Sequence, residues 1–142
     1  MAHLKNSAAK GLTPVPYPNT AGEAVVHRYT INIPATAAVG DIAEFACIPA
    51  TTRPTDIVVD VTGAISADIG VLSGDWASED TERTIGDEFA TAADLTADAL
   101  FRPTKPSAVR VPQKDTARGI GLKITTAPTA AVTVGITLTV VA

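Results

Sequence analysis

Apolar and polar residues alternate with a period of two along much of the chain, most clearly over 119–140. Isoleucine and leucine alternate with small or polar residues over 120–125, and aliphatic residues alternate with threonine and glycine over 132–140. Half-buried antiparallel strands have this period. With the Pro-containing loop at 126–130, the pattern predicts a C-terminal hairpin at the centre of the fold. One face of its second strand is uncharged, so we expect that face to pack against a second sheet or a sister subunit. The residues on that uncharged face are Thr133, Thr137 and Thr139.

The same alternation predicts further short strands. They are expected at 24–33, 42–48, 56–65, 66–73 and 107–112, with a hairpin joining 56–65 to 66–73. Pro34 and Pro49 end the first two strands because proline donates no ladder hydrogen bond. No βαβ rhythm is present. The pattern therefore predicts an all-β, mainly antiparallel domain over 23–142, built as a small β-sandwich or barrel.

The first 22 residues differ from this pattern. Pro14, Pro16 and Pro18 alternate with Val15 and Tyr17, which favours an extended backbone without regular ladder donors. We therefore expect residues 1–22 to form an extended N-terminal arm. Such an arm is either disordered in the free protein or laid across a neighbouring subunit.

A long acidic excursion is expected over residues 74–103. Between residues 74 and 98 the chain carries eight acidic residues and a single base, Arg83. Leu95, Ala99 and Leu100 share a face at helical spacing, which predicts one short helix within 90–101. Long excursions from a small β domain are often interaction sites.

Composition narrows the possible functions. The chain has 25 Ala and 20 Thr, with an aromatic fraction of 4%. A core built mainly from β-branched aliphatic residues is thin, and oligomerisation is a natural way to supplement it. The net charge of −4 argues against binding to nucleic acid or to an anionic membrane. No apolar run approaches the ~20 residues of a membrane-spanning helix, and residues 1–22 lack the apolar core of a secretory signal. We therefore expect synthesis in the cytoplasm of the host cell.

Catalytic equipment is not recognisable in the sequence. The single cysteine, Cys47, lies in an apolar run and is interpreted as a buried side chain, and His3 and His27 are too far apart for a metal cluster. Acids at 75, 79, 80 and 82 could ligate calcium, but they lack EF-hand spacing, so a solvated or partner-facing surface is favoured. The prediction is a protein with no enzymatic activity, no cofactor and no metal.

Several segments resemble small capsid decoration proteins of tailed bacteriophages, also called cement or head-stabilising proteins. These segments are Phe45-Ala46-Cys47-Ile48-Pro49-Ala50, Asp56-Ile57-Val58-Val59-Asp60-Val61, Asp68-Ile69-Gly70-Val71-Leu72-Ser73-Gly74, Arg83-Thr84-Ile85-Gly86 and Ile124-Thr125-Thr126-Ala127-Pro128-Thr129-Ala130 with Val132-Thr133-Val134. The likeness spans residues 42–142, and its motifs are structural rather than catalytic.

The resemblance implies a β-rich oligomer on the outside of an icosahedral shell, where it bridges neighbouring major capsid protein subunits against internal DNA pressure. A homotrimer is favoured over a homodimer. The resemblance has no motif in the arm, so a clamping role for the arm is a hypothesis, as is contact through the acidic excursion. Two alternatives are a carbohydrate- or receptor-binding sandwich and a tail or fibre component of a virion. The candidate contact residues are Pro14, Pro16, Tyr17, Pro18, Trp76, Arg83 and Phe89.

Overall fold

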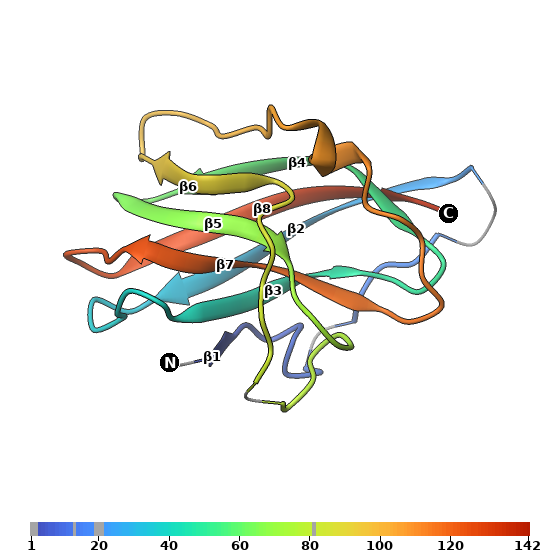
Figure 1. The fold of residues 1–142 in the computed structure, drawn as a ribbon, viewed down its shortest axis with the longest axis horizontal. Coiled ribbons are helices and arrows are strands. Elements are labelled where there is room, and N and C mark those ends of the chain that lie inside the picture. The colour runs from blue at the N-terminus through green and yellow to red at the C-terminus, as the bar shows by residue number, and fades with distance from the viewer. Residues whose placement is uncertain (1–2, 13, 19–21, 81) are drawn as a thin grey trace.

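Two β-sheets face each other across one core in the computed structural model, which describes residues 3–12, 14–18, 22–80 and 82–142 (Figure 1). One sheet has five strands in the order β1-β3-β7-β5-β6, and the other has three in the order β2-β8-β4. Every strand pair is antiparallel except β1 with β3. The predicted all-β fold is confirmed, and of its two forms the sandwich is the one observed. The elements are β1 His3–Lys5, β2 Ala24–Ile33, β3 Ile42–Ile48, β4 Arg53–Val61, β5 Ile65–Val71, β6 Ala90–Leu95, the 3-10 helix η1 Pro106–Val109, β7 Arg118–Thr126 and β8 Val132–Val141.

The core lies between the sheets and is built from alternating positions. On β8, the apolar set from Val132 to Val140 is buried at every second residue, as the period of two predicts. Strand β3 is different because all seven of its residues are buried, including Glu44. Its neighbours in the sheet are β1 and β7, and other parts of the chain cover both of its faces.

The predicted C-terminal hairpin is wrong. Strand β7 is the middle strand of the five-stranded sheet and β8 is the middle strand of the three-stranded sheet, so the loop 127–131 crosses from one sheet to the other. The predicted hairpin of 56–65 with 66–73 is wrong for the same reason, since β4 pairs with β8 whereas β5 pairs with β6 and β7. Two consecutive strands can bury their apolar faces against each other across a sandwich as readily as side by side. Periodicity identifies the buried face, but it does not identify the partner strand.

The short helix expected within 90–101 is also absent. Residues Ala90–Leu95 form β6 at the edge of the five-stranded sheet, and Phe101 forms a bridge with Val59. Ala92 has a φ of 46° and its N–H donates to Asp68 Oδ1 at 2.7 Å, where the β5–β6 register shifts. The only helix among the described residues is η1, which replaces the strand expected at 107–112. Pro106 suits the start of this helix because its φ is preset and it needs no donor there.

Residues 3–12 of the expected arm pack on their own chain. Strand β1 pairs with β3, and the Asn6 side-chain nitrogen donates to the carbonyl oxygens of Thr30 at 3.1 Å and Phe45 at 2.9 Å. Ala8 is buried in the core. Residues 1–2, 13 and 19–21 of the expected arm lie outside the described residues. The boundary between an arm and a domain after residue 22 stays a prediction.

Candidate interaction surface

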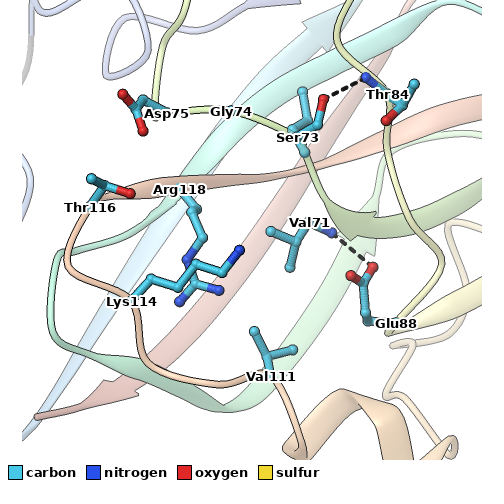
Figure 2. Close-up of a pocket in the computed structure, with 11 residues that line it drawn as sticks. Val71, Ser73, Gly74, Asp75, Thr84, Glu88, Val111, Lys114, Thr116 and Arg118 are labelled. Atoms are coloured by element: carbon cyan, nitrogen blue, oxygen red, sulfur yellow. Dashed lines mark hydrogen bonds between the residues drawn. The ribbon is translucent and has the colours of Figure 1, made fainter.

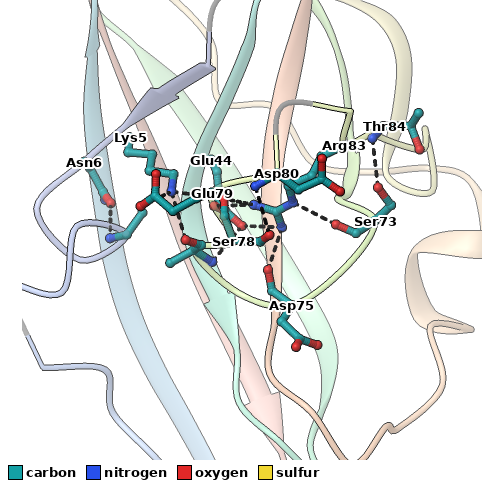
Figure 3. A network of polar contacts seen from close by, with 12 residues as sticks. Lys5, Asn6, Glu44, Ser73, Asp75, Ser78, Glu79, Asp80, Arg83 and Thr84 are labelled. Carbon is teal, nitrogen blue, oxygen red and sulfur yellow. Dashed lines mark hydrogen bonds and ion pairs between the residues drawn. The ribbon is translucent and has the colours of Figure 1, made fainter.

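A buried arginine holds the first part of the acidic excursion (Figure 3). Arg83 and Glu44 form a bidentate ion pair with both N–O distances at 2.8 Å, and their side chains are 2% and 3% exposed. Arg83 Nε also donates to the carbonyl oxygen of Ser73, and Nη2 to that of Asp75, each at 2.8 Å. A weaker bond of 3.4 Å reaches the carbonyl oxygen of Ser78. We call residues 73–80 and 82–83 the clamped loop, because one guanidinium ties this segment to β3.

The N-terminal strand supports the same loop from the other side. Lys5 Nζ donates to the carbonyl oxygens of Ala77 at 2.9 Å and Ser78 at 3.1 Å, and lies 3.7 Å from a carboxylate oxygen of Glu79. Ala77 has a φ of 61°, and its N–H donates to Glu44 Oε2 at 3.3 Å. Three segments far apart in sequence, β1, β3 and the clamped loop, are therefore held together, and β1 and the loop form the exposed part.

The candidate contact residues fall into two groups that the structure does not bring together. Near residue 17, Pro14 is exposed and Tyr17 is 49% exposed, with its hydroxyl 2.8 Å from Thr51 Oγ1. Pro16 is half-buried and Pro18 is buried. In the excursion, Trp76 is half-buried against the core.

The other two candidate residues, Arg83 and Phe89, are buried in the folded chain. Arg83 is 2% exposed and Phe89 is 1% exposed, so their side chains contact the protein's own residues. Partner contact by the seven candidates stays a prediction. Glu44 was not a candidate, although a single charged residue inside an otherwise apolar strand was a readable signal that a buried cation must lie opposite.

The outer face of the three-stranded sheet carries a row of uncharged threonines on β8, flanked by charged residues of β2 and β4. Thr133, Thr137 and Thr139 point away from the five-stranded sheet and are half-buried among side chains of β2 and β4. Arg28 and Asp60 form an ion pair that spans β8, and the guanidinium lies over Gly135. The expected second sheet over the threonines is not present in the described chain, whereas their contact with a sister subunit stays a prediction.

Groups with chemical reactivity are few among the described residues. No three His, Cys, Asp or Glu side chains there are grouped so that they could hold a metal ion. Cys47 is buried, and burial, with a smaller contribution from the charge of Glu44, raises the pKa of its thiol to about 12. The thiol is therefore protonated and shielded at neutral pH. The described chain has no helix that is long and apolar enough to cross a membrane.

Comparison with known proteins finds likeness in structure rather than in sequence. No protein-family model matches the chain, and no curated protein matches it. Over 99% of both chains, the fold matches a chain from the capsid of Ralstonia phage GP4, with a TM-score of 0.87 and 26% identity. Over 91% of both chains, it matches a chain of the capsid asymmetric unit of cyanophage Pam1, with a TM-score of 0.60 and 11% identity. The second match concerns the fold alone. Both of these structural neighbours are chains of phage capsids.

Proposed function

We propose that this protein is a structural component of a phage virion that binds the outer surface of the capsid and bridges major capsid protein subunits. The observation that carries the proposal is the full-length match to a chain of the Ralstonia phage GP4 capsid. Capsid neighbours also suggest a structural rather than a catalytic role. The sequence resemblance to decoration proteins supports the finer assignment to the exterior of the shell.

The surface formed by β1 and the clamped loop suits a bridging role. Arg83 and Lys5 hold the loop in one shape before any partner binds, so little conformational entropy is lost on binding. The exposed acids of this loop, Glu79, Asp80 and Glu82, would face a basic patch on the capsid subunits.

The carbohydrate-binding alternative receives less support from the structure. A surface that binds sugar rings needs exposed aromatic side chains. Among the described residues, Tyr17 is the only aromatic residue whose side chain is exposed. Trp76, the expected centre of such a platform, packs against the core.

The direct test is decoration of particles that lack this protein. Purified chain is added to capsids assembled from the major capsid protein of the same virus, and binding is measured by co-sedimentation and cryo-electron microscopy. The proposal expects density outside the shell across junctions between subunits, and symmetry of that density reports whether the predicted trimer or dimer is present. Density confined to the tail would instead support the tail or fibre alternative, and no binding to the capsid would overturn the proposal.

A further inference from the structure

A cavity of about 380 Å³ opens beside the clamped loop and contains none of the seven candidate residues (Figure 2). One wall is formed by the end of β5 and the start of the clamped loop. The opposite wall is the segment 111–118, which leads into β7. Side chains that line the cavity include Arg118, Lys114, Glu88 and Asp75.

Arg118 is a buried cation with unused hydrogen-bond donors. It is 4% exposed, and its Nη2 donates to the carbonyl oxygen of Pro112 at 2.8 Å. Its Nε is buried and has no hydrogen-bond partner among the described residues. Burial lowers the pKa of this guanidinium, and the charge of Glu88 only partly offsets that effect. A buried charge without a close counter-ion is costly, and the cost is relieved when an anion binds.

Arg83 provides an internal comparison for this state. It is as deeply buried as Arg118, but a bidentate carboxylate and three carbonyl oxygens satisfy it. Arg118 has no carboxylate oxygen within 4 Å among the described residues. The same residue type at the same depth therefore lacks the anionic partner that Arg83 has.

The charges around the cavity select the kind of anion. Lys114 is exposed, lines the same cavity and forms no ion pair with a described residue. On the opposite wall, Glu88 accepts a hydrogen bond from the Val71 N–H at 3.1 Å, and Asp75 adds a second negative charge. Glu88 and Asp75 would repel a doubly charged phosphate more strongly than a singly charged carboxylate. A carboxylate is also a planar acceptor that fits the edge of a guanidinium group.

We propose that this cavity binds the carboxylate of an aspartate or glutamate side chain from a neighbouring capsid protein, held by Arg118 and Lys114. This inference rests on the proposed function, because a side chain delivered by a bound neighbour loses less entropy than a free small acid. The site adds a basic contact beside the acidic excursion.

Charge reversal at Lys114 tests the inference in the full chain on capsids. Lys114→Glu is expected to weaken capsid binding by at least about tenfold, because the incoming carboxylate then meets a like charge. Lys123→Glu is the matched control, since Lys123 is exposed, changes the net charge equally and does not line the cavity. Lys123→Glu is expected to bind within about threefold of the wild type, the range of a remote surface charge.

Zero-length carbodiimide cross-linking of decorated capsids identifies the partner. The expected product is an amide between Lys114 and an acidic residue of another capsid chain, located by mass spectrometry. In the isolated protein, acetate is expected to shift the Arg118 Nε–H resonance, whereas chloride at equal ionic strength and phosphate are expected to shift it far less.

The outcomes separate the two proposals. Wild-type capsid binding by Lys114→Glu, together with no cross-link at Lys114, would overturn the carboxylate site and leave the proposed function standing. A response of Arg118 to phosphate but not to acetate would overturn the ligand class. Failure of the wild-type chain to bind capsids would overturn the proposed function, and with it the capsid source of the carboxylate.

Discussion

Glycines in the strands make room for charged side chains of neighbouring segments. A Cβ on Gly119 would collide with the carboxylate of Glu44, and a Cβ on Gly135 would collide with the guanidinium of Arg28. Glycine inside a strand normally weakens it. Here the missing side chains of Gly119 and Gly135 let ionic groups lie close against the sheets.

The atoms that meet an added Cβ determine how much each glycine matters. At Gly121 the Cβ would meet the backbone carbonyl of Ala43, which cannot move without breaking the sheet, whereas at Gly135 it would meet a long, exposed side chain. We expect Gly121→Ala to cost about 3 kcal/mol or more of unfolding free energy and Gly135→Ala less than about 1 kcal/mol. Urea unfolding measures both, and equal losses would contradict this explanation.

The two arginine–carboxylate pairs differ in burial and should differ in energy. Arg83→Met leaves the Glu44 carboxylate buried without its cation, so we expect a loss of about 3–5 kcal/mol in unfolding free energy. Arg28→Met is the matched control, because the Arg28–Asp60 pair is half-exposed, and its loss should stay below about 1 kcal/mol.

The double variant Arg83→Met with Glu44→Gln should regain part of the lost stability, since no unpaired charge then remains buried. If the single variants at Arg83 and Arg28 lost the same stability, the buried pair would not be the anchor of the clamped loop. Denaturant titration of the four proteins decides between these results.

The buried thiol of Cys47 and the buried phenol of Tyr29 make the stability of the fold sensitive to high pH. Burial raises the pKa of Cys47 to about 12, and it also raises the pKa of Tyr29 well above its usual value of about 10. Above about pH 9 the unfolded chain releases these protons while the folded chain keeps them, so stability falls as pH rises through this window. Between neutral pH and about pH 8, this contribution is fully present.

We expect the melting temperature of the wild type to fall between pH 9 and pH 11. In the double variant Tyr29→Phe/Cys47→Ala, we expect it to fall less steeply. Tyr17→Phe, at an exposed tyrosine, should leave the slope unchanged. Calorimetry across this pH range measures the slopes, and identical slopes for all three proteins would rule out the buried acids as the cause.

At the scale of elements, the support of the clamped loop by β1 can be tested without disturbing the core. Lys5→Ala removes two hydrogen bonds to the loop carbonyls of Ala77 and Ser78. A loss of about 1 kcal/mol in local stability should speed amide hydrogen exchange at residues 76–80 by about fivefold. The control is Lys10→Ala, because Lys10 is exposed and makes no polar contact with the described residues of the loop. Unchanged exchange in Lys5→Ala would contradict the support of the clamped loop by β1.

Strand positions could be predicted from the sequence more fully than strand partners. The ranges 24–33 and 42–48 agree with β2 and β3, because alternation and the following prolines mark both strands clearly. The spacing of Leu95, Ala99 and Leu100 fits a helix face, but edge pairing with β5 makes the first part of that segment a strand instead. Tertiary pairing overrides such a weak local preference.

The sequence drew attention to the acidic excursion, but it did not reveal how the folded chain holds that segment. The charge imbalance marked residues 74–98, and Arg83 stood out as their only base, whereas partner contact through this segment stays a prediction. The partner of Arg83, Glu44, lies 39 positions away in the sequence, and no local pattern links the two residues. Arg118 gave no signal at all, since its exceptional state comes from burial that only the packed chain creates.

At the scale of the whole molecule, both sheets depend on the same short part of the sequence. Strand β8 is the only partner of β2 and β4 in the three-stranded sheet, and β7 joins β3 to β5 in the other. A chain that ends at Ala131 should therefore be unfolded, because β2 and β4 then lose every strand partner in their sheet. Circular dichroism and thermal melting measure this, and a retained cooperative transition would contradict it.

This placement of β7 and β8 has a consequence for biosynthesis. While the ribosome is still adding residues 118–141, the emerged chain holds six strands without the two that lie at the centre of the sheets. Folding is therefore expected only after synthesis has passed β8, and until then the exposed edges of β3, β4 and β5 are open to pairing with other nascent chains. Under the proposed function, in which many copies bind one shell, synthesis of this chain would depend on chaperones or on spacing between ribosomes.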